Sequence, residues 1–250
     1  ALPAHAGAPA QWLVVASDVT EQREADRARL QAAITQREVL VKEVHHRIKN
    51  NLQGVAGLLQ QHAERQPQVA ATLGEAVAQV RAIAQVYGLQ VGASGLLRLE
   101  RVVEAIAQSV QRTFGRAIAF APAPDDSADF VLPEAESIPI ALTLNELLTN
   151  TVKHGDGEVR CSLRAEGAAG EVAVIEMRHA GELPPDFTVD RIRGGVSGLG
   201  LVRALLPRRS AEFALTARDG EVCTTVTLRR PSVQRESAAI GHNQAQETSA

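Results

Sequence analysis

The feature that most constrains this fold is a long apolar stripe through residues 21–65. Its members are spaced mostly three or four residues apart, which is the period of a helix face: Leu30, Ile34, Leu40, Val44, Ile48, Leu52, Val55 and Leu59. A helix over 21–65 would be about 65 Å long at 1.5 Å per residue. Because so long a helix with one apolar side is unstable alone in water, it must pack in a coiled coil or a helix bundle.

A second apolar stripe, from Val69 to Tyr87, follows Pro67, and Pro67 ends the first helix. Glycines at 88, 92 and 95 mark the end of this second helix. Two antiparallel helices joined by a short turn bury only half of a core. The hairpin over 21–95 is therefore predicted to complete a four-helix bundle with a second copy, as a homodimer.

Beyond residue 95 the pattern mixes helices and strands. We expect helices over 99–114, 136–154 and 199–206, strands over 117–121, 129–132, 158–165 and 171–178, and a β-hairpin of 212–218 and 222–229. Asp219-Gly220 is a typical hairpin turn. The predicted fold class is α+β: a long helical hairpin, followed over 96–231 by an α/β sandwich with helices on one face of a mixed sheet.

The two ends of the sequence differ from these regions. Residues 11–16 have the pattern of one short strand, which needs a partner, and Asp18 or Thr20 can cap the helix that follows. We interpret 1–20 as the remainder of a domain that continues before this sequence. Residues 232–250 are polar, and we expect a disordered tail.

Composition excludes several classes of function. The 26 Lys and Arg against 29 Asp and Glu give a formal charge of -3, which is not the basic balance of a nucleic-acid binder. No apolar run reaches the roughly 18–20 residues that span a bilayer, so we expect no membrane segment. Cys161 and Cys223 have no partner at metal-ligand spacing, which argues against a zinc module and fits the reducing cytoplasm.

The densest polar cluster of the long helix lies at residues 43–52. His46 and Asn50 share one helix face at i,i+4, and Glu43 lies one turn before His46. An imidazole on a rigid helix beside a carboxylate and an amide can act as a nucleophile near pH 7. The alternative is a solvated charged face with two chance histidines, His45 and His46.

A second polar cluster lies on the helix expected at 136–154. Glu146, Asn150 and Lys153 are spaced i, i+4, i+7 and share one face, while Leu144, Leu147 and Leu148 point to the core. A carboxylate, an amide and a lysine in this order suit a metal-bridged polyphosphate, because amide oxygens are hard ligands for Mg²⁺. A salt-bridged surface stripe is the alternative.

A glycine-rich loop precedes the helix expected at 199–206. It contains Gly194, Gly195, Gly198 and Gly200. Such a loop presents backbone N–H groups and the positive end of a helix dipole to phosphates, although glycine loops also serve as plain hinges.

These three segments together resemble the two-component sensor histidine kinases, in the HWE-related class with an HHRxKNN phosphoacceptor motif. The phosphoacceptor motif is matched by His45-His46-Arg47-Ile48-Lys49-Asn50-Asn51. The N box of a Bergerat-type ATPase domain is similar to residues 145–150 together with Lys153-His154. The G box of that domain is similar to Gly198-Leu199-Gly200-Leu201. Residues 15–23 resemble the exit of a PAS sensory domain. The resemblance covers about 11–230.

The resemblance implies a role for each matching residue. His46 is the phosphorylated histidine, Asn150 binds Mg²⁺, and Glu146 is the acidic residue near the γ-phosphate of ATP. Lys153 and His154 lie at the phosphates, and Gly194, Gly195 and the G box, with Leu199 and Leu201, form the lid region. It also implies a response regulator as partner, whose receiver domain accepts the phosphoryl group on an aspartate. Glu43 or Glu146 would orient the imidazole of His46 or take its proton.

One stretch departs from the family pattern. The family has an Asp-x-Gly-x-Gly box, whose Asp receives the adenine amino group, and it corresponds to residues 177–184 here. In this sequence His179 replaces the Asp and Gly181 matches the first glycine of the box, but the second glycine is missing. A neutral imidazole can accept one hydrogen bond but lacks the carboxylate's charge. Two alternatives to a kinase therefore stay open: an ATP-independent phosphotransfer or response-regulator phosphatase module, and a non-catalytic dimerisation scaffold.

Overall fold

The computed structural model describes residues 17–92, 97–122, 129–168, 170–184, 187–189, 192, 195–196 and 198–236. The chain divides into two compact units, residues 1–42 and 43–250. The described part of the first unit is helical from Thr20 onward, and the Asp18 carboxylate accepts a hydrogen bond from the backbone N–H of Thr20 (2.9 Å). Asp18 is thus a cap, as predicted. The strand expected at 11–16 lies outside the described residues.

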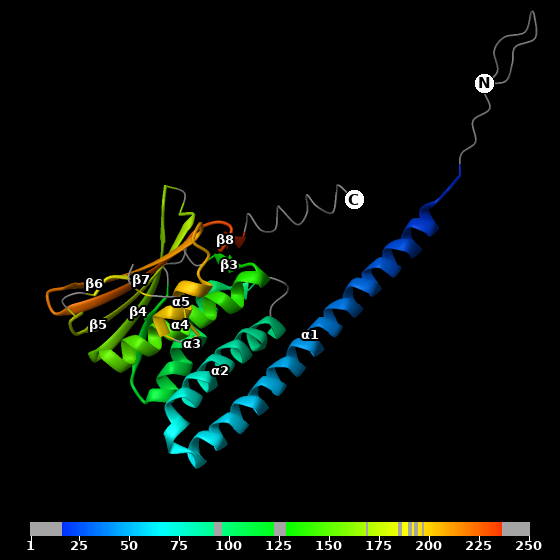
Figure 1. The fold of residues 1–250 in the computed structure, drawn as a ribbon. Helices are drawn as coiled ribbons and strands as arrows, with labels where there is room; N and C mark the ends of the chain where they lie inside the picture. Colours follow the sequence, from blue (N-terminus) through cyan, green and yellow to red (C-terminus); the bar gives the residue numbers. More distant parts are fainter. Residues whose placement is uncertain are drawn as a thin grey trace, which may run out of the picture. The chain divides into compact units, whose positions relative to one another are not determined.

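The helical hairpin matches its prediction closely (Figure 1). Helix α1 spans Thr20–Arg65, a 3-10 turn spans Pro67–Val69, and α2 spans Ala70–Gly92. Helix α2 buries four small apolar side chains: Val77, Ala82, Ala84 and Val86. In contrast, Ala56 is the one buried residue of α1, and the α1 stripe stays exposed at Val44 (52%) and Val55 (45%).

The α/β domain over residues 97–236 contains the remaining elements. In chain order these are β1 (Leu97–Arg98), α3 (Leu99–Phe114), β2 (Ile118–Ala121), β3 (Phe130–Leu132), α4 (Glu134–His154), β4 (Asp156–Glu166), β5 (Val172–Ala180), α5 (Gly198–Leu205), β6 (Ala211–Arg218), β7 (Glu221–Leu228) and β8 (Gln234–Arg235). The main sheet has the order β2-β4-β5-β7-β6, with β2 parallel to β4 and every other pair antiparallel. The sheet is therefore mixed, as expected.

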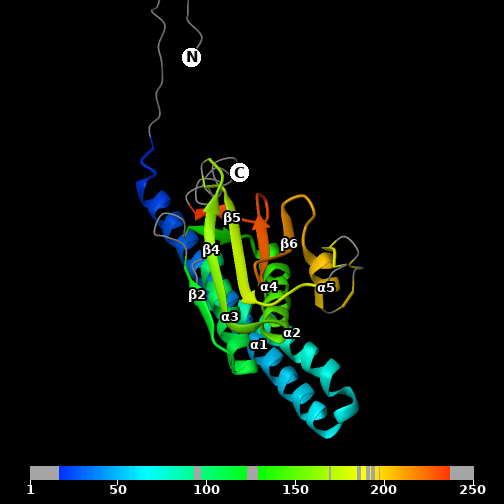
Figure 2. The same ribbon diagram turned by 90° about the vertical axis from the view of Figure 1, so that its left-hand side faces the viewer.

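Helices α3 and α4 cover one face of this sheet (Figure 2). Strand β5 alternates accordingly: Ile175 and Met177 are fully buried, whereas the side chain of Arg178 lies on the other face. Helix α4 contributes Leu144, Leu147 and Leu148 to the same core, each at most 1% exposed. The predicted α/β sandwich with helices on one face is confirmed.

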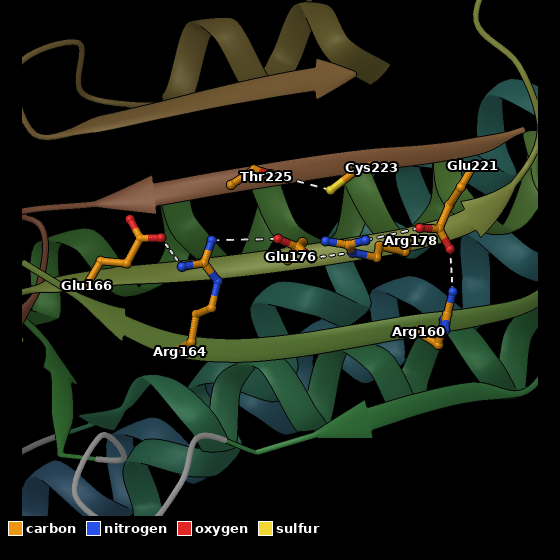
Figure 3. Close-up of polar contacts among 8 residues, drawn as sticks. All are labelled: Arg160, Arg164, Glu166, Glu176, Arg178, Glu221, Cys223 and Thr225. Carbon is orange, nitrogen blue, oxygen red and sulfur yellow. Dashed lines mark hydrogen bonds and ion pairs between the residues drawn. The ribbon is translucent and has the colours of Figure 1, made fainter. Parts of the chain in front are cut away.

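The opposite face of the sheet is a ladder of alternating charges (Figure 3). Arg178 binds Glu176 and Glu221, and Arg160 also binds Glu221. Arg164 lies 3.7 Å from Glu176. The hydrogen bond from Arg178 holds the pKa of the Glu221 carboxyl below its ordinary value. This face is charged and paired, which is why the apolar helices gather on the other side.

The closing hairpin turns where the sequence predicted. Asp219 (φ 54°) and Gly220 (φ 76°) both have positive φ, as a two-residue type I′ turn requires. The turn keeps β6 and β7 in continuous register, from Arg218 opposite Glu221 to Ala211 opposite Leu228.

The expectation of a disordered tail from residue 232 is wrong for 232–236. Ser232 and Val233 are fully buried, and β8 pairs with β3 in a small sheet of order β1-β3-β8. Arg98 donates a hydrogen bond to Glu236 at the same place. The buried Val233 side chain, the hydrogen bond between the Ser210 and Ser232 hydroxyls (2.8 Å) and the strand pairing with β3 together fix this segment. Residues 237–250 lie outside the described part of the chain.

No helix in the described ranges combines the length and the apolar character that a membrane crossing requires.

Candidate functional site

Helix α4 places Glu146 inside the protein. Because Leu144, Leu147 and Leu148 fix one side of α4 in the core, Glu146 lies on the adjacent side, where it is only 5% exposed. Its Oε1 accepts a hydrogen bond from the Gln79 side-chain nitrogen (3.1 Å), and its Oε2 accepts one from the backbone N–H of Gly198 (2.9 Å). The alternative of a salt-bridged surface stripe is therefore wrong for Glu146.

The glycine loop meets the same carboxylate. Gly198 (φ 58°) begins α5, whose first turn contains half-buried Leu199, Gly200 and Leu201. The Gln79 nitrogen also donates to the carbonyl of Val196 (3.2 Å), although the Val196 side chain itself is 87% exposed. The loop before α5 is thus joined to both α2 and α4. Gly195 is exposed, and Gly194 lies outside the described residues.

The other predicted residues of α4 lie toward its C-terminal end. Asn150 is half-buried, and its side-chain amide has no hydrogen-bond partner within the described ranges. Lys153 and His154 are exposed. The Lys153 ammonium lies 6.0 Å from the centroid of the Phe114 ring on α3. Asn150 is therefore available to a ligand, whereas Lys153 contacts an aromatic ring instead of lying free.

His179 occupies the inner face of β5, next to the end of α4. It is 6% exposed, and its Nδ1 lies 2.9 Å from the carbonyl oxygen of Ala180. In a neutral ring with the Nδ1–H donating to this carbonyl, Nε2 remains a hydrogen-bond acceptor. A Cβ at Gly155 would lie only 2.3 Å from Nδ1, so the ring packs directly on this glycine. A Cβ at Gly181 (φ 152°) would also come close to this ring, 3.3 Å from its Cε1 and Nδ1.

The donor chemistry of this region fits a magnesium nucleotide better than a bare metal. Among the described residues no group of three or more His, Cys, Asp or Glu side chains comes together to bind a metal ion. Mg²⁺ is usually held by one or two protein oxygens while substrate phosphates and waters complete its coordination. The Asn150 amide, unpaired among the residues that the structure describes, and the Glu146 carboxylate, one turn before it on α4, supply oxygens of this kind.

On α1 the two neighbouring histidines differ in their surroundings. His46 is exposed, and its Nδ1 lies 3.3 Å from the Asn50 amide nitrogen, as the i,i+4 spacing predicted. The contact engages Nδ1 and leaves Nε2 as the accessible nitrogen. His45 instead faces α2, where its ring lies 5.5 Å from that of Tyr87, and its Nδ1 is buried without a hydrogen-bond partner among the described residues.

Glu43 does not bond to His46. Its Oε1 accepts a hydrogen bond from Arg47 (2.7 Å), and this bond lowers the pKa of the Glu43 carboxyl. An i,i+4 Glu-Arg pair with this orientation is favourable on a helix, which explains why it forms.

Gln79 is the functional candidate that the sequence did not reveal. It lies between Ala78 and Val80 on a mainly apolar helix, and no motif includes it. The available signal was weak: an amide at the edge of the apolar stripe of α2, on the side that turns out to face α4.

Comparison with known proteins agrees with this arrangement. Residues 43–114 match the HisKA_2 family model, described as histidine kinase. The chain is 30% identical over 234 residues to the sensor histidine kinase PdtaS of Mycobacterium tuberculosis, a match that covers 89% of this chain and 44% of that protein. PdtaS of Mycolicibacterium smegmatis is 29% identical over 213 residues, which cover 77% of this chain and 38% of that protein. The chain thus spans less than half the length of these relatives.

Solved structures share the fold. The histidine kinase domain of the Erythrobacter litoralis EL346 blue-light activated histidine kinase aligns with a TM-score of 0.50 at 18% identity, covering 77% of this chain and 94% of that domain. A second structure of the EL346 kinase aligns with a TM-score of 0.51 at 20% identity, covering 76% of this chain and 58% of that one. The order of a helical hairpin and an α/β domain is thus common to these proteins.

Proposed function

Because this chain is related to the sensor histidine kinases over most of its length, we propose that it is the kinase core of such a protein. In this proposal it phosphorylates His46 from ATP and passes the phosphoryl group to an aspartate in the receiver domain of a response regulator. The observation that carries the proposal is the grouping of three features: the buried Glu146 carboxylate, the Asn150 amide one turn later on α4, and Gly198 at the start of α5, whose N–H donates to Glu146.

The nucleotide would lie along the side of α4 that bears Glu146 and Asn150. When bound, ATP with Mg²⁺ supplies the phosphoryl group, and the metal offsets the phosphate charge. Asn150 offers a metal ligand, and the first turn of α5, from Gly198 to Leu201, offers backbone N–H groups to phosphates, that of Gly198 once Glu146 has released it. His179 would accept the adenine amino group at Nε2, with Gly155 and Gly181 leaving room for its ring. Lys153 would leave Phe114 to reach a phosphate, with His154 beside it.

His46 would attack through Nε2 once the Asn50 amide has turned so that its oxygen accepts the Nδ1–H, because with the amide nitrogen at Nδ1 the proton of a neutral ring lies on Nε2. Catalysis of phosphoryl transfer rests mainly on positioning and on charge stabilisation. Of the two carboxylates expected to receive the imidazole proton, Glu43 is bound to Arg47 and has a lowered pKa, which makes it a weak base. We therefore assign this role to Glu146.

The helical hairpin would serve as the dimerisation and phosphotransfer module. Its apolar stripe is exposed at Leu30 (63%), Leu40 (58%) and Val44 (52%). An exposed apolar stripe of this kind is expected on a helix that packs against a second copy of the chain. We assign residues 21–95 to this module in a homodimer, residues 97–236 to the ATP-binding domain, and residues 1–20 to the end of a PAS-like sensor. The HHRxKNN motif favours the HWE-related class, and two cysteines outside any disulfide, Cys161 and Cys223, fit a cytoplasmic protein.

The test is incubation of the purified chain with γ-labelled ATP and Mg²⁺. Acid-labile label is expected on the parent and on His45→Ala, the matched control, but on neither His46→Ala nor Asn150→Ala. Label that persists in His46→Ala would place the acceptor elsewhere and refute the assignment of His46.

The replacement of the expected Asp by His179 supports a second candidate function. Without the carboxylate, ATP affinity falls, and the hairpin could act as a phosphotransfer or response-regulator phosphatase module. This alternative predicts no nucleotide binding by calorimetry, together with uptake of phosphate by His46 from a phosphorylated receiver domain.

A further inference from the structure

One glutamine joins three elements around the proposed nucleotide site. The side-chain nitrogen of Gln79, on α2, donates both of its hydrogens: one to the Glu146 carboxylate on α4 (3.1 Å) and one to the carbonyl of Val196 before α5 (3.2 Å). Both neighbours are pure acceptors, so the amide oxygen cannot occupy this place. The hydrogen-bond network therefore fixes the orientation of the amide.

These bonds leave Glu146 little freedom to act on a substrate. Both of its carboxylate oxygens already accept hydrogen bonds, from Gln79 and from Gly198, and the side chain is only 5% exposed. Meanwhile His46 has its side-chain contact with Asn50 on its own helix, and within the described ranges it has none with α4 or with the loop before α5. The arrangement thus keeps the carboxylate and the acceptor histidine apart.

We propose that Gln79 is a positioning residue that holds Glu146 and the loop before α5 in a resting arrangement. Phosphoryl transfer to His46 then requires that Gln79 release both. This inference rests on the proposed function and adds its regulation, because any displacement of α2 that withdraws Gln79 frees the carboxylate and the loop together.

The substitution Gln79→Glu tests the contact with almost no change of shape. At pH 8 it places a carboxylate against two acceptors, while Gln79→Met keeps the length and removes the donors. Gln90→Met is the matched control for Gln79→Met, since Gln90 also joins α2 to α4, through Ser137 (3.4 Å), without touching Glu146. The full chain is used throughout, and thermal melting identifies any variant that fails to fold.

Two readouts are compared, the kinetics of His46 labelling and the hydrogen exchange of the Gly198 amide by NMR. A hydrogen bond to a charged group shifts an equilibrium by about 10- to 100-fold. We expect both Gln79 variants to raise kcat by up to about tenfold, with a smaller change in KM for ATP, and to speed Gly198 exchange. Gln90→Met should change neither. A purely structural role would instead lower kcat together with the melting temperature.

Unchanged or lowered kcat in both folded Gln79 variants would overturn the proposal. If no chain, parent included, becomes labelled, the proposed function fails, and the exchange measurement decides on the contact by itself. Slow Gly198 exchange that persists in Gln79→Met would then show that Gln79 does not hold the loop, and would overturn the inference separately.

Discussion

The substitution Gly155→Ala tests how tightly the end of α4 is packed on His179. Gly155 is buried, and an added Cβ would lie 2.3 Å from the His179 Nδ1 and 2.7 Å from the Thr151 carbonyl oxygen. The φ of Gly155 is -89°, which alanine adopts readily, so any cost is steric and not conformational.

The surrounding structure limits how this overlap can be relieved. The Gly155 N–H donates to Thr151 (3.0 Å), and its carbonyl accepts a hydrogen bond from Arg116, which also binds the carbonyl of Val152 (2.7 Å). The backbone is therefore held on both sides, and the His179 ring must move. Overpacking of a core costs about 1–3 kcal/mol, and with little room to relax we expect about 2–3 kcal/mol.

Urea unfolding followed by circular dichroism measures this cost. Gly74→Ala is the control, because nothing lies within 4 Å of its added Cβ, and alanine in a helix interior should stabilise by about 0.5–1 kcal/mol. Adding His179→Ala to Gly155→Ala should recover roughly 1 kcal/mol of coupling energy. A Gly155→Ala chain as stable as the parent, or one with no coupling to His179, would refute the described packing.

The remaining predictions concern nucleotide specificity, thiol reactivity and assembly. His179→Ala should weaken ATP binding, measured by calorimetry, by about tenfold, because one acceptor for the adenine amino group is lost. The affinity for GTP should fall less, and an equal loss of affinity for ATP and GTP would contradict the contact between His179 and the base. Burial raises the pKa of Cys161 to about 12. At pH 8 iodoacetamide should therefore alkylate the half-buried Cys223 before Cys161. Equal alkylation rates of the two thiols in the folded chain would exclude the difference in their burial. Val44→Asp should convert a dimer to a monomer in light scattering, and a persistent dimer would place the interface elsewhere.

The sequence predicted best those features that repeat along it. Helix α4 followed from the period of Leu144, Leu147 and Leu148, all of which are buried. The type I′ turn followed from a dipeptide whose conformation is almost fixed by its chemistry. In both cases a local pattern determined the local structure, so no knowledge of distant contacts was needed.

Features that depend on distant partners escaped prediction. Strands β1 and β8 contain two residues each and have no period to detect. Gln79 lies 67 residues from Glu146, and only folding brings them together. Glu43 was expected beside His46, but it pairs with Arg47, because a charged partner one turn away attracts it more strongly than an imidazole does.

The small sheet β1-β3-β8 brings the two ends of the α/β domain close together. Its first and last strands flank the same central strand β3, so they lie about 10 Å apart at the usual strand spacing. A domain whose two ends lie this close together can be inserted into another protein or circularly permuted with a short linker. Joining residue 236 to residue 97 should therefore give a circularly permuted domain that folds, provided that Val233 is retained.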